Sequence, residues 1–281
     1  MPSRKRPRSA LIRVGAPVAA AAALGTAVWG FAAANASQPA VKLPPTGTGF
    51  DYQIGEAYTP PAGVGVVSRD NSAEPAKGLY NICYINAFQS QPGDSRPGHE
   101  GKWSGLLVKN SSGKLAEDPD WAGEYALDIS TPAKRQALAA KMNATIDQCA
   151  DKGFDAVEPD NYDSYTRFSG LTAADAEAYM SLLVEHAHSR HLAIAQKNTA
   201  ELAGKAKSLG IDFAVTEECG AYAECGDYEK AFGDHVVDIE YSDKGLKAAC
   251  AGWSKKFGVV ERDQDVSAPG DDDYLRKTCG S

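Results

Sequence analysis

The chain has 281 residues and a formal charge of −8, with 37 acidic against 29 basic side chains. This length suits one large domain, and the acidic balance disfavours nucleic acid as a partner, because phosphate binding needs a basic face. P-loop, G-x-S-x-G and G-x-G-x-x-G motifs do not occur, so NTPase, serine hydrolase and dinucleotide-binding functions lack support, and no cofactor is expected.

Residues 1–36 have the pattern of an export signal. A basic start precedes an Ala-rich apolar stretch, and Ala34-Asn35-Ala36 provides an A-x-A cleavage site. An uncleaved membrane anchor is the alternative, but glycines and a proline within the stretch disfavour a spanning helix. Cleavage would leave 245 of the 281 residues, with 24 basic and 37 acidic side chains and a charge of −13. We therefore predict a secreted, extracellular protein that does not contact the membrane after cleavage.

Residues 37–49 are rich in Pro, Gly and Thr, which predicts a disordered linker before a domain spanning residues 50–281. Short apolar runs then alternate with helical stretches, which is typical of an α/β fold with a parallel sheet. The candidate strands are Asp51–Ile54, Val64–Ser68, Tyr80–Phe88, Tyr125–Ile129, Phe154–Glu158, Leu192–Gln196, Phe213–Thr216, Val236–Tyr241 and Phe257–Glu261.

Nine candidates exceed by one the strands of a (β/α)8 barrel, the TIM-barrel fold. Residues 55–63 separate the first two and are too few for a helical crossover between parallel strands. We therefore predict a TIM barrel with one extra strand near the N-terminus, in which Val64–Ser68 is the first barrel strand. Two helices are well marked, over residues 132–150 with a Thr131 cap and over residues 172–188 with a capping-box start.

Six cysteines in an exported chain favour disulfides over metal ligands, and no C-x-x-C pair occurs. Cys219 and Cys225 are close enough in sequence to close a short loop. Fifteen connectivities are possible, and our hypothesis adds two further pairs to that one. These are Cys250 with Cys279, and Cys83 with Cys149.

Two apolar runs end in carboxylates, at Glu158 and Asp160 and at Glu217 and Glu218. Strand alternation places Glu158 and Asp160 on the same side, and the active site of a barrel lies at the carboxyl ends of its strands. In the second run, the alternation of apolar residues favours Glu217 as the acid that points into the barrel. Glu218 remains an alternative, because strands often twist or bulge at the barrel rim. Two facing carboxyl groups are what glycoside hydrolysis requires, so all four are candidate catalytic residues.

Other polar and aromatic side chains near strand ends form a collar suited to sugar hydroxyl and amino groups. The candidate substrate-binding residues are Asp70, Tyr84, Asn86, Asp128, Asn161, Tyr165, Lys197, Asn198, Glu240 and Tyr241. Arg262 and Asp263 extend the collar, and Phe88, Tyr162 and Tyr222 are further candidates for stacking on sugar rings. His186 and His188 would point to nearly opposite faces of a helix, so no metal site is expected.

These pieces together resemble glycoside hydrolase family 114, the endo-α-1,4-polygalactosaminidases, also seen in spherulin-4-like proteins. The resemblance covers roughly residues 50–265 and is carried by Gly153–Tyr165, Leu171–Asp175, Glu185–His188, Ala195–Asn198, Phe213–Cys219 and Ile239–Tyr241.

The resemblance implies a TIM barrel, export, and endo-hydrolysis of an α-1,4-linked galactosamine polymer with retention, as in degradation of galactosaminogalactan-type polysaccharide. It assigns Asp160 as the nucleophile, Glu217 or Glu218 as the acid/base, and Glu158 as a neighbour that tunes charge or binds an amino group. The implied partner is a cationic amino-sugar polymer. Two alternatives stay open: a non-catalytic carbohydrate-binding barrel, and an α-glycosidase that acts on a neutral galactose-type polymer.

Overall fold

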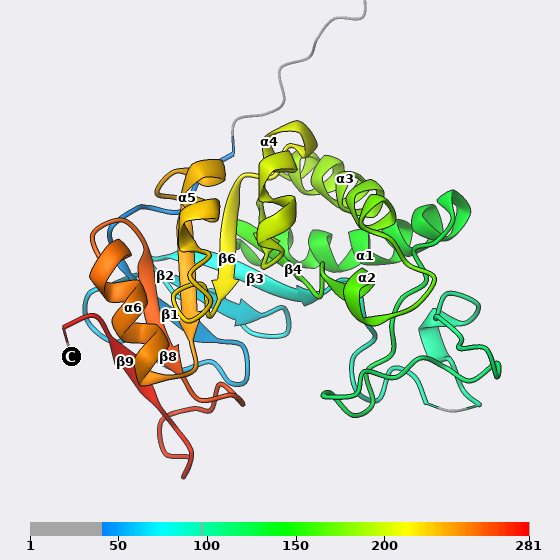
Figure 1. The fold of residues 1–281 in the computed structure, drawn as a ribbon, viewed down its shortest axis with the longest axis horizontal. Coiled ribbons are helices and arrows are strands. Elements are labelled where there is room, and N and C mark those ends of the chain that lie inside the picture. The colour runs from blue at the N-terminus through cyan, green and yellow to red at the C-terminus, as the bar shows by residue number, and fades with distance from the viewer. Residues whose placement is uncertain (1–40, 97, 281) are drawn as a thin grey trace, which may run out of the picture. The chain divides into compact units, whose positions relative to one another are not determined.

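Short runs of β-branched and aromatic residues form a single sheet whose strands follow chain order (Figure 1). The computed structural model describes residues 41–96 and 98–280. The strands are β1 (Gly49–Gln53), β2 (Val64–Asp70), β3 (Tyr80–Asn86), β4 (Ala156–Asp160), β5 (Ala193–Lys197), β6 (Phe213–Glu217), β7 (Val236–Glu240), β8 (Gly258–Arg262) and β9 (Arg276–Thr278).

Strands β1 to β8 pair in parallel, and the sheet curls until β8 approaches β1. A Cβ atom added at Gly258 of β8 would lie 2.7 Å from the Cβ of Phe50 in β1, so only glycine allows this approach of the two strands. The predicted TIM-barrel fold is confirmed.

The extra strand is not near the N-terminus, and that part of the prediction is wrong. β1 pairs in parallel with β2 and is a barrel strand, whereas the ninth strand, β9, lies at the C-terminal end and is antiparallel to β8. The connection over residues 54–63 carries no helix. Ten residues span at most about 33–36 Å, which is enough to cross back along a five-residue strand of about 17 Å without one.

The candidate strand Tyr125–Ile129 is also wrong, because it forms only isolated bridges and joins no barrel strand. It lies in a long β3–α1 segment (residues 87–131), where Tyr125, Leu127 and Ile129 pack into the outer core. The run is therefore apolar because it is buried against the outside of the barrel, and not because it is a strand of the sheet.

Helices cover the outside of the barrel from β3 onward (Figure 1). They are α1 (Pro132–Lys152), α2 (Ser164–Arg167), α3 (Ala173–Ser189), α4 (Ala206–Leu209), α5 (Cys225–Phe232) and α6 (Asp243–Trp253), with two 3₁₀ helices, Gly101–Trp103 and Ala200–Lys205. The Thr131 side chain caps α1, and Thr172 and Asp175 form the predicted capping box of α3. Among the described residues, no helix combines the length and hydrophobicity that a membrane span requires.

Two apolar cores follow from the strand alternation. Alternate strand residues, among them Phe50, Ile82 and Phe213, fill the barrel interior, and a larger core lies between the barrel and its helices. On β4 to β6 the inward row ends in Glu158 and Asp160, Lys197 and Glu217. The barrel thus brings these side chains to one end of its interior.

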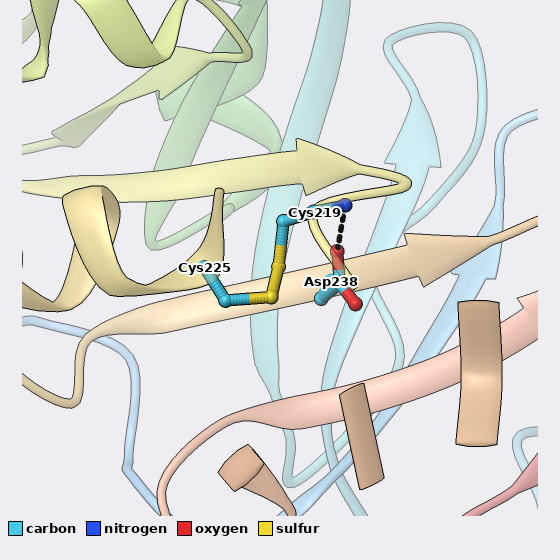
Figure 2. A group of neighbouring side chains, drawn as sticks. All are labelled: Cys219, Cys225 and Asp238. Atoms are coloured by element: carbon cyan, nitrogen blue, oxygen red, sulfur yellow. Dashed lines mark hydrogen bonds between the residues drawn. A yellow bond between two sulfur atoms is a disulfide. The ribbon is translucent and has the colours of Figure 1, made fainter. Parts of the chain in front are cut away.

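All three predicted disulfides are present: Cys83–Cys149, Cys219–Cys225 (Figure 2) and Cys250–Cys279. They join β3 to α1, close the loop after β6, and tie α6 to the segment after β9.

The described part of the predicted linker packs on the barrel, so the expected disorder is wrong from Val41 onward. Val41 and Leu43 contact the interior core, and the Lys42 ammonium lies 2.8 Å from Asp155 Oδ1. The Pro44 carbonyl lies 3.0 Å from His235 Nδ1. Residues 37–40 and the predicted signal segment lie outside the described residues.

Candidate active site

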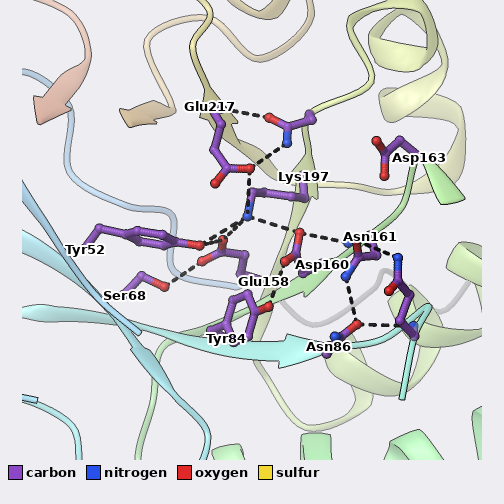
Figure 3. Close-up of polar contacts among 12 residues, drawn as sticks. Tyr52, Ser68, Tyr84, Asn86, Glu158, Asp160, Asn161, Asp163, Lys197 and Glu217 are labelled. Carbon is purple, nitrogen blue, oxygen red and sulfur yellow. Dashed lines mark hydrogen bonds and ion pairs between the residues drawn. The ribbon is translucent and has the colours of Figure 1, made fainter. Parts of the chain in front are cut away.

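A buried lysine is the centre of the site (Figure 3). Lys197 is 2 % exposed, and its Nζ atom lies 3.1 Å from Glu158 Oε1, 3.1 Å from Asp160 Oδ1 and 3.5 Å from Glu217 Oε2. Burial alone would lower the pKa of Lys197, but the three carboxyl groups outweigh it and hold the pKa well above its ordinary value. Lys197 is therefore a permanent cation between three acids.

Asp160, the last residue of β4, is held ionised by its neighbours. Its Oδ2 accepts a hydrogen bond from the Tyr84 hydroxyl at 2.7 Å, and its Oδ1 accepts one from the Asn161 backbone N–H at 2.8 Å. Burial raises the pKa of Asp160, but the Lys197 charge and these hydrogen bonds outweigh it, so the pKa lies below the usual range. A carboxylate in this state is a competent nucleophile.

Glu217, the last residue of β6, faces Asp160 across Lys197. Its Oε1 accepts from the Tyr241 hydroxyl at 2.5 Å, and its Oε2 accepts from Asn198 Nδ2 at 2.9 Å. The Asn198 Oδ1 atom in turn accepts from the Glu217 backbone N–H at 2.7 Å, so one amide fixes both ends of the residue. Glu217 is thus oriented by two neighbouring strands.

Glu158 lies below the other two acids and is fully buried. It accepts hydrogen bonds from the Ser68 hydroxyl at 2.6 Å and the Tyr52 hydroxyl at 3.0 Å, in addition to Lys197. Burial raises its pKa, and Lys197 and Ser68 offset part of that shift. Glu158 does not line the cleft, and it contacts Lys197 from below.

Above this floor lies an open cleft of about 780 Å³. Among the described residues that line it, eleven are acidic and one, Arg167, is basic. Two aromatic side chains on its walls are unusually exposed, Trp121 by 51 % and Tyr222 by 66 %. The cleft is therefore negatively charged, open to solvent and bordered by two exposed aromatic rings.

One acidic wall residue, Glu124, was missed by the sequence reasoning. Its Oε2 accepts from Asn86 Nδ2 at 2.8 Å, and burial, with the charges of Asp160 and Asp118, raises its pKa to about 7. It lies in the β3–α1 segment, far in sequence from any carboxylate-tipped strand. No local signal marks it, because only the fold brings this segment over the barrel mouth.

Comparison with known proteins agrees with this geometry. The profile of glycoside-hydrolase family GH114 matches residues 30–281. The chain belongs to family GH114. A protein of Deinococcus radiodurans described as uncharacterized is 33 % identical over 206 residues, which is 66 % of this chain and 64 % of that protein. The GH114 chain therefore spans less than two thirds of the length of this relative.

Two solved structures share the fold. Aspergillus fumigatus Ega3, crystallised in complex with galactosamine, is 25 % identical with a TM-score of 0.66, over 86 % of this GH114 chain and all of the other chain. The glycoside hydrolase domain of PelA from Pseudomonas aeruginosa is 15 % identical with a TM-score of 0.51, over 82 % of this chain and 97 % of that domain. The second likeness bears on the fold alone.

Most predicted site residues of the GH114 domain meet at the barrel mouth. The cleft is lined by Asp70, Tyr84, Asp160, Asn161, Asn198, Glu217, Glu218, Tyr222 and Tyr241. Two others support this lining from behind: Lys197 as described above, and Asn86, whose Oδ1 accepts from Asn161 Nδ2 at 3.0 Å. Glu218 has a positive φ of 60°, and its N–H donates to the Ile239 carbonyl at 2.7 Å.

Three further predicted substrate contacts, Asp128, Tyr165 and Glu240, do not line the cleft. Asp128 accepts from Ser130 N–H and pairs with Lys134 at the start of α1. The Tyr165 hydroxyl donates to Glu201, and Glu240 points to the outer side of β7. Strand phase explains the last error, since Val237 and Ile239 fill the barrel interior and their even-numbered neighbours face outward.

The remaining collar candidates are structural. Arg262 is fully buried and donates to the carbonyls of Leu275 and Ser267. Phe88 and Tyr162 pack against each other in the outer core, with ring centroids 5.6 Å apart. His186 and His188 hydrogen-bond to Asp147 and Asp212 respectively, each at 2.8 Å.

Three side chains of types that can bind a metal ion lie close together near the loop after β6. Cys219, Cys225 and Asp238 have ligand atoms within 4.8 Å of one another. The two sulfur atoms are joined in a disulfide, so they provide no thiolate for a metal ion (Figure 2).

Proposed function

We propose that this GH114 domain is an exported glycoside hydrolase that cleaves an α-1,4-linked, galactosamine-containing polysaccharide within the chain and retains the anomeric configuration. The observation that carries the proposal is the convergence of Asp160 and Glu217, from different strands, on the Lys197 ammonium at the floor of an acidic cleft.

Asp160 is the nucleophile. It forms a bond to the anomeric carbon as the glycosidic C–O bond breaks, and its depressed pKa keeps it ionised for this step. Lys197 neutralises the Asp160 carboxylate, and the Tyr84 hydroxyl orients it.

Glu217 is the acid and then the base. It gives its proton to the leaving oxygen, and afterwards takes a proton from the water that attacks the anomeric carbon and releases Asp160. The nearest oxygens of Asp160 and Glu217 are at most 6.6 Å apart, because they lie 3.1 and 3.5 Å from the same nitrogen atom. This upper limit admits the separation of about 5–5.5 Å found in retaining enzymes and lies at the lower edge of the range of about 6.5–9.5 Å found in inverting ones.

A cationic polymer is supported by the charge of the cleft. With eleven acids and one arginine along its lining, the cleft has a field that concentrates amino sugars and repels anionic chains. Trp121 and Tyr222 offer exposed rings on its walls, which suits a chain longer than one sugar. The complex of Ega3 with galactosamine supports the same substrate class.

Export is supported by the three disulfides, which persist in oxidising compartments, and by the basic and apolar start of the sequence.

The experiment is a substrate panel: partially deacetylated poly-α-1,4-galactosamine, its fully N-acetylated form, and a neutral α-galactan. We expect new reducing ends from the first polymer, with α-anomers as initial products by NMR. Cleavage of the neutral polymer alone would favour the galactosidase alternative. Polymer binding without new reducing ends would favour a carbohydrate-binding barrel.

A further inference from the structure

Two buried carboxyl groups on the outer side of β7 have no place in the mechanism above. Asp238 and Glu240 are both fully buried, and they share the side of the strand that faces away from the barrel interior. Two ionised acids buried side by side on one face of a strand would destabilise the fold. The groups that surround them must therefore offset this cost.

In each carboxyl group, one oxygen accepts hydrogen bonds from neighbouring donors. Asp238 Oδ1 accepts from the Thr216 hydroxyl at 2.7 Å. It also accepts from the Cys219 N–H at 3.3 Å (Figure 2). Glu240 Oε1 accepts from the Gly220 N–H at 2.7 Å. These donors belong to the end of β6 and to the β6–α5 loop (residues 218–224).

The second oxygen of each group, Asp238 Oδ2 and Glu240 Oε2, meets no N–H or O–H donor among the described residues. Both groups lie on the same face of β7, two residues apart, and both are buried. A proton shared between them would give both of these oxygens a partner. Burial, followed by the charge of Glu240, raises the pKa of Asp238 well above its ordinary value, which favours Asp238 as the group that carries this proton.

The surrounding backbone closes tightly on this pair. A Cβ atom at Gly245, in the first turn of α6, would lie 2.0 Å from Glu240 Oε2, and one at Gly220 would lie 2.7 Å from Glu240 Oε1. Only glycine fits at either position. The loop and the helix thus both depend on where the Glu240 carboxyl group stands.

The β6–α5 loop is a wall of the active-site cleft. It follows Glu217 directly and carries Glu218 and Tyr222, which line the cleft. The Cys219–Cys225 disulfide links its second residue to the first residue of α5. We propose that Asp238 and Glu240 form a proton-sharing carboxyl pair that positions this loop for substrate binding. Both are positioning residues, since neither lines the cleft.

The proposal predicts a distinctive pH dependence. The other titratable groups that face the pair are Glu218 from the loop and Tyr228 from α5, while α6 presents the backbone of Gly245. Because the pKa of Asp238 is raised on folding, the stability from its proton is complete below about pH 4 and is lost as pH rises through the raised value. Loss of the proton leaves two buried charges and releases the loop.

The test compares Asp238→Asn with Asp238→Ala. An asparagine keeps the oxygen that accepts from Thr216 and Cys219, and its Nδ2 donates to Glu240 without a proton that can be lost. We expect the Tm of Asp238→Asn, relative to wild type, to rise steadily between pH 4 and pH 9. Hydrogen exchange in residues 217–225, corrected for intrinsic rates, should stay protected in Asp238→Asn as pH rises, whereas the protection of wild type should fall with rising pH relative to that of Asp238→Asn.

The inference rests on the proposed function for its kinetic arm, in which Asp238→Ala should lower kcat/KM at least tenfold and Asp238→Asn should restore it to within threefold. Should Asp238→Ala fail to fold, Glu240→Gln, which can donate to an ionised Asp238, provides a second variant with the expectations of Asp238→Asn. A Tm difference independent of pH, or equal exchange in all variants, would overturn the inference. Exchange and Tm as predicted, without turnover by wild type, would instead contradict the proposed function alone.

Discussion

Replacing Lys197 by methionine removes the cation that lies between three carboxyl groups while keeping a side chain of similar length. Lys197 lies 3.1 Å from both Glu158 and Asp160. Removing one partner of a buried ion pair costs about 3–5 kcal/mol, because the remaining charges stay buried without compensation. At about 2–4 °C per kcal/mol for a domain of this size, the Tm should fall by roughly 6–20 °C.

The catalytic effect should be equally specific. An adjacent cation lowers the pKa of an aspartate by about 1–3 units, so its loss should raise the pKa of Asp160 by that amount. An ionised nucleophile is lost as pH falls, so the acid limb of kcat/KM should move to higher pH by about 1–3 units. The assay is a pH profile of reducing-end release, with Tm by calorimetry in the same buffers.

A matched control is available in Lys205→Met. Lys205 is 57 % exposed and pairs with Glu177 at 2.6 Å, so its loss should cost only about 0–1 kcal/mol and leave the pH profile unchanged. If Lys197→Met kept both the wild-type Tm and the wild-type acid limb, the electrostatic account of the site would be refuted.

Three further expectations concern the cleft wall and the frame. Trp121→Ala and Tyr222→Ala should each raise KM on long polymer severalfold and leave Tm within about 2 °C, because both rings are exposed; equal effects on a disaccharide would argue against a platform role. In Glu124→Gln the Tm relative to wild type should rise between pH 5 and pH 8, because a pKa raised to about 7 makes the wild type lose stability over that range; a flat difference would contradict this. Removing the Cys83–Cys149 bond, which spans a separation of 66 residues, should cost about 4 kcal/mol in denaturant unfolding, and a cost below about 1 kcal/mol would contradict the loop-entropy estimate.

The acidic residues at the barrel mouth were easier to predict from the sequence than the arrangement of the strands. Glu158, Asp160 and Glu217 were identifiable because an apolar strand ending in an acid is costly without a function, and strand phase gave their direction. The same phase argument failed for Glu240, because both faces of β7 are apolar next to the acids, and only the observed positions of Val237 and Ile239 decide which face is inside.

Other features lay beyond any local pattern. The sequence gives no sign that β1 pairs with β2 through a connection without a helix, or that Tyr125 to Ile129 is buried outside the barrel. The central position of Lys197 was also hidden, since a lysine at a strand end is usually solvated. Its burial at 2 % exposure follows from the closure of the barrel, which is a property of all eight strands together.

The most direct test of the central claim is reducing-end release from partially deacetylated poly-α-1,4-galactosamine by wild type, Asp160→Asn, Glu217→Gln and the control Asp163→Asn. Asp163 also lines the cleft, but it pairs with Arg167 rather than with Lys197. We predict that Asp160→Asn and Glu217→Gln each lose at least a thousandfold in kcat while remaining folded, and that Asp163→Asn stays within about tenfold. Substantial turnover by Asp160→Asn would contradict its role as nucleophile and, with it, the mechanism proposed for this site.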